Sequence, residues 1–116
     1  MPSPTNIILH QQSRQLEIAF DDGAHYRFPF EFLRVHSPSA EVRGHGQGQE
    51  VLQTGKQNVV LLDVQPIGSY AIRLAFDDGH DSGLYTWEYL CELGKYQDAM
   101  WHDYLHKMEE AGKSRE

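Results

Sequence analysis

The chain has 116 residues, of which 40% are hydrophobic, and this length and composition suit one globular domain with no room for a second. Its formal net charge of −7, with the few cations scattered along the chain, disfavours nucleic acid and anionic membrane surfaces as partners. Cys91 is the only cysteine, which excludes an internal disulfide and a cysteine-rich zinc site.

The first elements predicted along the chain are strands joined by a tight turn. Alternating apolar residues predict strands over residues 7–9 and 16–20. A three-residue loop at 21–23 places Ile18 opposite Tyr26, so that apolar side chains share one face. A two-residue loop would shift the register by one residue and turn one strand's apolar side chains to water. We therefore expect the three-residue loop, with its glycine in the left-handed region.

The middle of the chain changes character after this hairpin. Pro29 ends the second strand of the hairpin, and residues 30–35 predict a short helical turn. Residues 37–57 are rich in Ser, Gly and Gln and show little periodicity, which predicts a long loop. An apolar run then predicts a strand over residues 59–64, and Pro66 begins a turn.

The sequence AFDDG occurs twice, at residues 19–23 and 75–79. A strand over residues 70–76 leads into the second copy, and the register of the first hairpin would place Ile72 opposite Leu84 and Phe76 opposite His80. The residues that follow His80 are turn formers, so we expect this hairpin to open into a loop. The repeat indicates one structural device that is used twice.

Two helices are expected at the C-terminal end. Thr86 suits the N-cap of a helix over residues 87–93, and Gly94 would stop this helix. A second helix over residues 96–108 carries an apolar stripe that would cover one face of the sheet. The stripe consists of Met100, Trp101, Tyr104, Leu105 and Met108. The predicted fold is therefore α+β: a small, mainly antiparallel β-sheet with a long Gly/Ser loop and C-terminal helices, flexible at about residues 1–5 and 110–116.

One loop concentrates polar chemistry, and it allows two interpretations. An acidic turn would use its Asp and Ser side chains to cap local backbone amides. A recognition or metal site would place the imidazole of His80 at its centre. No serine lies in a nucleophile motif, and no base is tied to one by sequence. The loop consists of Asp77, Asp78, Gly79, His80, Asp81 and Ser82.

Two segments resemble the signatures of a known family. LRVHSPSAEVRGH at residues 33–45 and GHDSGLYTW at residues 79–87 are similar to those of the gamma-butyrobetaine hydroxylase-like N-terminal domain family. The resemblance runs from about residue 9 to residue 105, and it implies a single domain of this family over residues 1–116. It also implies a free-standing bacterial protein, without the 2-oxoglutarate oxygenase domain that follows in the hydroxylases. The chain is therefore not expected to be an enzyme.

The resemblance also bears on metal binding. In the hydroxylases this domain holds a structural zinc through three cysteines and a histidine, and these positions correspond to Ser37, Ser39, Val42 and His80. Serine hydroxyls are poor zinc ligands and valine offers no ligand atom. We therefore expect no cofactor and the loss of the structural zinc. In its place we expect His80 to hydrogen-bond across to residues 37–45.

Three functions remain open at this stage. The leading one is a non-catalytic protein-interaction or accessory module whose partner is another protein. The alternative is a metal-binding or metal-delivery domain that uses His80 with His36 or His45. The third is a small enzyme acting at the His80 loop. The first residues lack the features of a signal peptide and no apolar run could span a bilayer, so a cytoplasmic location is expected.

Overall fold

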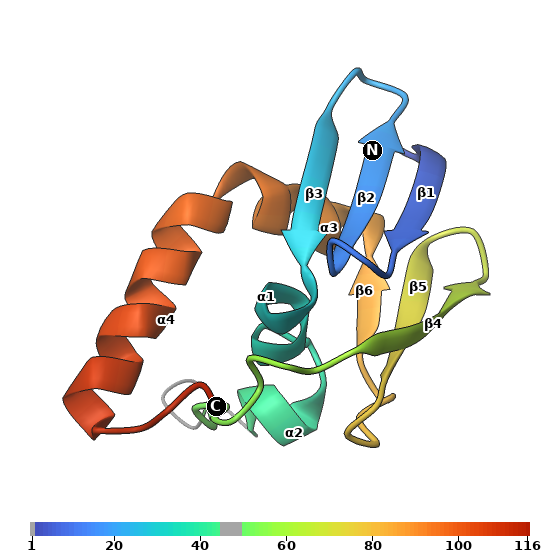
Figure 1. Ribbon diagram of the computed structural model, residues 1–116. Coiled ribbons are helices and arrows are strands. Elements are labelled where there is room, and N and C mark those ends of the chain that lie inside the picture. Colours follow the sequence, from blue (N-terminus) through green and yellow to red (C-terminus); the bar gives the residue numbers. More distant parts are fainter. Residues whose placement is uncertain (1, 45–49) are drawn as a thin grey trace.

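The computed structural model describes residues 2–44 and 50–116 and has an α+β fold. Six strands form two antiparallel sheets of three strands each, in the orders β1-β2-β3 and β4-β5-β6, where one sheet was expected (Figure 1). The strands are β1 Pro4–His10, β2 Gln15–Phe20, β3 His25–Pro29, β4 Leu61–Ile67, β5 Ala71–Phe76 and β6 Leu84–Thr86. The helices are α1 Phe30–Val35, α2 Ala40–Arg43, α3 Trp87–Lys95 and α4 Gln97–Ala111.

The first hairpin has the predicted register. Ile18 pairs with Tyr26, and the Phe20 amide donates to the Ala24 carbonyl over 2.8 Å. Gly23 has a φ of 90°, as the three-residue loop requires. The inward face of β2 is fully buried at Leu16, so the alternation read from the sequence sets which face packs inward.

The second hairpin departs from its predicted register by one residue. Ile72 pairs with Tyr85 rather than with Leu84. Near the turn the prediction holds, because the Phe76 amide donates to the His80 carbonyl over 2.9 Å. The extra residue therefore lies between His80 and β6. It turns Tyr85 into the core and leaves Leu84 42% exposed. The observed register is favoured because it buries the Tyr85 ring, which has a larger apolar surface than the Leu84 side chain.

Three predictions about individual elements were wrong, and each has a local structural reason. The strand β4 continues through Pro66, which it tolerates because β4 is an edge strand. The helix α3 continues through Gly94, whose missing Cβ makes room for the Tyr26 ring, since an ideal Cβ there would lie 2.5 Å from that ring. The segment expected to be one long loop contains α2, which the Ser39 side chain caps by accepting from the Glu41 amide.

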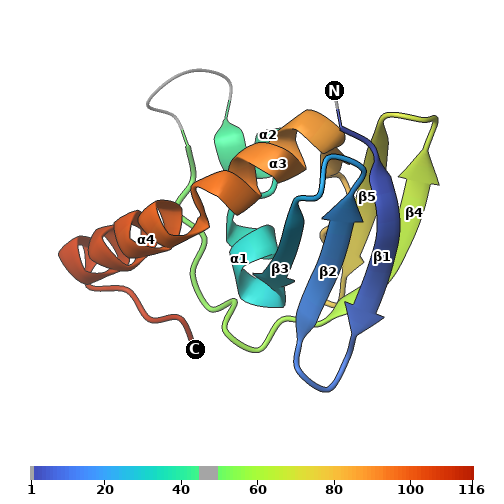
Figure 2. The same cartoon turned by 90° about the horizontal axis from the view of Figure 1, so that it is seen from above.

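The main core lies between the sheets and the helices α1 and α3. Figures 1 and 2 show α1 between β3 and α4, and α4 extending away from the sheets. A second small core under α4 consists of Val35, Tyr104 and Met108, with Leu52 and Leu105 packed against it. The apolar stripe predicted for the last helix therefore does not cover a face of the sheet, which was the expectation, but packs mainly against α1 and Leu52. No helix of the described residues has the length and apolar character needed to cross a membrane.

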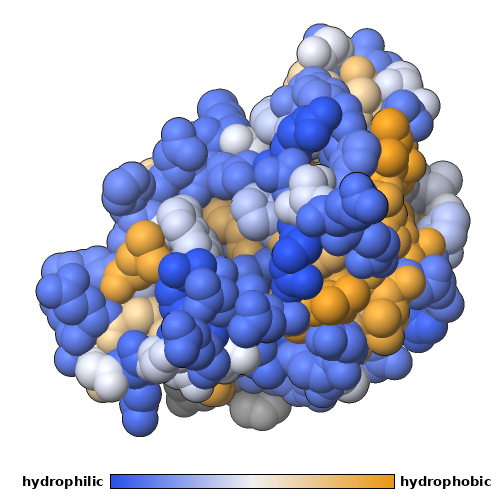
Figure 3. All heavy atoms as spheres, in the orientation of Figure 1, coloured by the Kyte–Doolittle hydropathy of each residue, from blue (hydrophilic) through white to orange (hydrophobic). Residues whose placement is uncertain are grey.

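The surface is largely hydrophilic in the view of Figure 3. Apolar side chains gather there along the flank where β1 and β4 lie. Ile8 on β1 and Leu62 on β4 are exposed by 37% and 59%. They lie on edge strands of the two sheets.

Candidate functional site

The second AFDDG turn places His80 where the first turn has an alanine. In both turns an aspartate Oδ1 accepts from the amide two residues on: Asp22 from Ala24 over 2.9 Å, and Asp78 from His80 over 3.1 Å. Gly79 has a φ of 85°, close to that of its counterpart in the first turn. The shared backbone therefore carries different side chains, and only the second turn presents an imidazole. That imidazole is buried, since only 4% of the residue is exposed.

Both ring nitrogens of His80 are bonded to the part of the chain that leads into and forms α2. Nε2 lies 2.8 Å from Ser37 Oγ, and Nδ1 lies 2.8 Å from Glu41 Oε2. Because a carboxylate only accepts, Nδ1 carries the proton toward Glu41, and in the neutral ring Nε2 accepts from the Ser37 hydroxyl. The expected link between His80 and residues 37–45 is therefore confirmed. We call Ser37, Ser39, Glu41, His80 and Ser82 the His80 cluster.

The segment before α2 and the His80 loop are joined by a second hydrogen bond within the cluster. Ser39 Oγ lies 2.7 Å from Ser82 Oγ and also accepts from the Glu41 amide over 3.2 Å. Val42 is buried nearby in α2. Of the positions that correspond to the zinc ligands, Ser37 and Ser39 bond to the histidine loop and Val42 lines a neighbouring cleft. Together with His80 they offer two hydroxyls, an aliphatic side chain and an imidazole already bonded on both sides. This donor set does not fit a zinc ion.

The acidic residues of the loop mainly hold the backbone and two cations. Asp77 Oδ1 accepts from the Val60 amide over 3.0 Å. Asp78 Oδ2 accepts from Arg34 Nε over 2.8 Å and from Lys56 Nζ over 2.6 Å. Burial raises the pKa of Asp78, but these hydrogen bonds and the one from the His80 amide outweigh it and lower the pKa to about 2. The predicted capping of local amides is therefore seen only in the bond from the His80 amide to Asp78, while the other contacts of Asp77 and Asp78 reach distant parts of the chain and Asp81 is exposed.

Ser37, His80 and Glu41 are connected in the order of a serine–histidine–acid triad, and the two distances are those of such a triad. The hydroxyl is nevertheless inaccessible, because Ser37 is only 1% exposed. Gly83 packs against it so closely that an ideal Cβ there would lie 2.4 Å from Ser37 Oγ. An acyl group therefore has no approach to this oxygen in the structure.

His36, one of the two histidines considered as metal partners of His80, is engaged elsewhere. Its Nδ1 donates to the Phe32 carbonyl over 2.9 Å, and the His36 and Phe32 ring centroids lie 4.5 Å apart. His45 lies outside the described residues. Within residues 2–44 and 50–116, no three His, Cys, Asp or Glu side chains come together in a way that could hold a metal ion.

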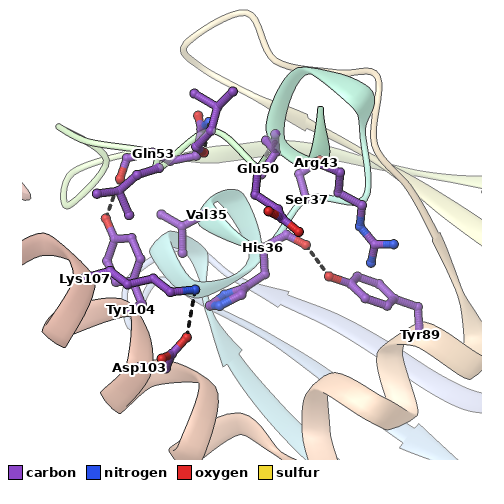
Figure 4. A pocket seen from close by; sticks show the side chains of 13 residues that line it. Val35, His36, Ser37, Arg43, Glu50, Gln53, Tyr89, Asp103, Tyr104 and Lys107 are labelled. Carbon is purple, nitrogen blue, oxygen red and sulfur yellow. Dashed lines mark hydrogen bonds and ion pairs between the residues drawn. The ribbon is translucent and has the colours of Figure 1, made fainter. Parts of the chain in front are cut away.

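The ring of His36 instead lines an open cleft of about 350 Å³, which we call the His36 cleft. It lies between the ends of α1 and α2, residues 50–53 and the helices α3 and α4, and Figure 4 shows its side chains. Burial lowers the pKa of His36, which favours the neutral ring with Nε2 as an acceptor. The lining residues are Val35, His36, Ser37, Val42, Arg43, Glu50, Val51, Leu52, Gln53, Tyr89, Asp103, Tyr104 and Lys107.

The His36 cleft combines an apolar and aromatic wall with fixed polar groups. The Tyr89 hydroxyl donates to the His36 carbonyl over 2.6 Å, and the Arg43 guanidinium lies 4.7 Å from the Tyr89 ring centroid. Across the cleft, Lys107 pairs with Asp103 over 3.0 Å. Sequence reasoning missed this site because its residues come from five separate segments. The one available signal was the apolar pair Val51–Leu52 inside a polar stretch.

Comparisons with known proteins place the chain among relatives of the same fold. The family model for gamma-butyrobetaine hydroxylase-like, N-terminal, matches residues 7–91. Two NMR solution structures share 54% and 48% sequence identity, with TM-scores of 0.86 and 0.85; they align over 100% and 99% of this chain and 91% and 86% of theirs.

A crystal structure from Acidithiobacillus ferrooxidans, of a protein with unknown function in the DUF971 family, shares 39% identity and a TM-score of 0.67. It aligns over 79% of this chain and 92% of its own. No significant match was found among curated proteins. The chain therefore belongs to the gamma-butyrobetaine hydroxylase-like N-terminal domain family.

Proposed function

We propose that the chain is a non-catalytic module that binds another protein, and that the His36 cleft is its binding surface. The observation that carries the proposal is that the His80 imidazole and the Ser37 hydroxyl are buried and already bonded, although Glu41 and Ser82 of the same cluster are exposed. Both nitrogens of His80 are engaged inside the protein, and Ser37 is buried under Gly83. A group that is already bonded on every side supports a structural role, in which it joins α2 to the β5–β6 hairpin.

The His36 cleft supports binding because it offers what the His80 cluster lacks. Its wall contains aliphatic and aromatic side chains, and its polar groups carry both signs of charge. A side chain with an apolar body and a polar tip would find contacts for both parts. Val51, at the cleft, is 53% exposed and would gain from being covered.

The alternative functions have weaker support. A metal at His80 would have to displace the hydrogen bonds to Ser37 and Glu41, and His36 is bonded to the Phe32 carbonyl instead of to His80. An enzyme at the His80 loop would need a nucleophile that a substrate can reach. As part of the proposal we place the module in the cytoplasm, where a lone thiol such as Cys91 stays reduced.

Affinity purification with matched variants tests the proposal. The bait is the tagged full chain, expressed in its native host, as wild type, Val51→Asp and Leu62→Asp. Both replaced residues are exposed aliphatic side chains, but Leu62 lies on β4, away from the cleft. We expect the wild type and Leu62→Asp to retain the same partner and Val51→Asp to lose it, while all three melt alike. Loss in both variants, loss in neither, or no partner with the wild type would contradict the proposal.

A further inference from the structure

The segment after α4 carries an arginine, Arg115, that is held by a buried carboxylate and an aromatic face. Arg115 donates to Glu31 through two parallel hydrogen bonds, Nε to Oε2 over 2.9 Å and Nη2 to Oε1 over 2.7 Å. The guanidinium carbon lies 5.3 Å from the Trp101 ring centroid. Only 8% of the Glu31 side chain is exposed. We call Glu31 and Trp101 the Glu31 pocket.

The backbone of the tail is held as well. Gly112 ends α4 in the left-handed conformation, with a φ of 62°, and the chain then turns back toward residues 55–57. The Ser114 carbonyl accepts from the Gly55 amide over 3.0 Å, and the Arg115 carbonyl accepts from the Gln57 amide over 2.8 Å. The sequence analysis expected a flexible end at about residues 110–116 and did not foresee these contacts, although most of the segment is exposed.

This arrangement is that of a bound peptide. Main-chain hydrogen bonds hold the segment, and a carboxylate and an indole receive one of its side chains. The pocket selects the side chain chemically. A planar guanidinium can bind a carboxylate through two hydrogen bonds and stack on an indole at the same time, whereas an ammonium group can do neither as well. The Glu31 pocket therefore fits arginine better than lysine.

We propose that the Glu31 pocket is a recognition site for an arginine-bearing peptide segment, which residues 113–116 occupy until a partner's arginine replaces them. Displacement is feasible because this segment lies at the surface: the Arg115 side chain is 37% exposed, and Lys113, Ser114 and Glu116 are exposed. An empty pocket would leave the Glu31 carboxylate buried without its cation, which is unfavourable. The site therefore requires an arginine from one chain or the other.

The Glu31 pocket adjoins the His36 cleft, since the Trp101 ring stacks on the Tyr104 ring over 5.3 Å, but it uses different residues, because none of Glu31, Trp101 and Arg115 lines that cleft. The two proposals can therefore fail independently. A partner could use both surfaces, but the recognition of arginine depends only on the Glu31 pocket and on residues 55–57.

Binding of a tail peptide to the full chain tests the inference. The probe is a fluorescein-labelled pentapeptide, Gly-Lys-Ser-Arg-Glu, with the sequence of residues 112–116, and the control peptide has lysine in place of arginine. Removing the internal competitor with Arg115→Ala should tighten binding of the arginine peptide about tenfold or more over the wild type. The arginine peptide should also bind this variant about tenfold more tightly than the lysine peptide does.

A second substitution identifies the carboxylate. In the double variant Glu31→Gln, Arg115→Ala, the arginine peptide should bind no more tightly than the lysine control peptide does. This double variant should fold, because the glutamine leaves no uncompensated charge at position 31. Arg115→Lys is the second variant if Arg115→Ala melts below the assay temperature, and it should also bind the arginine peptide more tightly than the wild type. Equal binding to wild type and variant, or equal binding of the two peptides, would overturn the inference.

Discussion

His80 Nε2 lies 2.8 Å from the hydroxyl of Ser37, 43 residues earlier in the chain. This bond joins the β5–β6 hairpin to the segment between α1 and α2. His80 Nδ1 makes a second bond to the same segment, at Glu41 Oε2 over 2.8 Å. The imidazole of His80 therefore links two parts of the fold that are distant in the sequence.

Replacing His80 should destabilise the protein. In His80→Ala the buried Ser37 hydroxyl loses its acceptor, and leaving such a group unsatisfied costs about 1–3 kcal/mol in the free energy of unfolding. His102→Ala is the matched control, because His102 is exposed on α4 and its removal should cost less than about 0.5 kcal/mol. Urea midpoints measure both. Equal midpoints would show that the bonds of His80 contribute nothing to stability.

Gly83→Ala should destabilise the protein through a clash with Ser37. An ideal Cβ at Gly83 would lie 2.4 Å from Ser37 Oγ and 3.2 Å from Tyr85 Cε1, and overpacking of this kind costs about 1–3 kcal/mol. Ser37→Ala removes the oxygen that the new methyl group meets. A double-mutant cycle should therefore show that Gly83→Ala is less harmful in the Ser37→Ala background. Additive effects would mean that the clash lies elsewhere.

Folding should not depend on a metal. The four positions that correspond to zinc ligands carry two serines, a valine and a histidine with both nitrogens bonded, so no metal-linked folding energy is expected. Thermal melts of freshly purified protein with and without a strong chelator should coincide. A drop of many degrees with chelator would contradict the hydrogen-bonded role of His80 and support the metal-binding alternative.

The ion pairs of Asp78 should make stability depend on acidic pH. Because the pKa of Asp78 falls from 3.8 to about 2 on folding, its contribution is present above pH 3.8 and is lost as the pH falls toward 2. The difference in unfolding free energy between the wild type and Asp78→Asn should therefore shrink across this interval. Asp81→Asn, at an exposed position of the same loop, should show no such change. A constant difference for Asp78→Asn would contradict the ion pairs with Arg34 and Lys56.

Much of the fold follows from local sequence patterns. The strict alternation Leu16, Ile18, Phe20 fixes the register of the first hairpin, because a slip by one residue would turn three apolar side chains to water. The second hairpin lacks this constraint at residues 81–83. There the register is set by tertiary packing, namely the burial of Tyr85 and the contact between Gly83 and Ser37, and sequence reasoning placed it one residue away.

In the candidate site, too, some features could be predicted from the sequence and others could not. The link from His80 to the segment after α1 could be predicted, since the family resemblance pairs those two segments. The His36 cleft could not be predicted, because no motif marks Tyr89, Tyr104 and Val51 as neighbours. The role of Arg115 was also missed, since a charged residue in a terminal tail gives no sign of the buried carboxylate that it meets.

Amide hydrogen exchange at residues 37–44 tests most directly whether His80 ties this segment to the hairpin. If it does, exchange at these amides should be about tenfold faster or more in His80→Ala than in the wild type, because local opening becomes less costly there. The amides of β2 should be much less affected, and His102→Ala should match the wild type throughout. Unchanged exchange at residues 37–44 in His80→Ala would contradict the structural role of His80 and reopen the search for what its imidazole does.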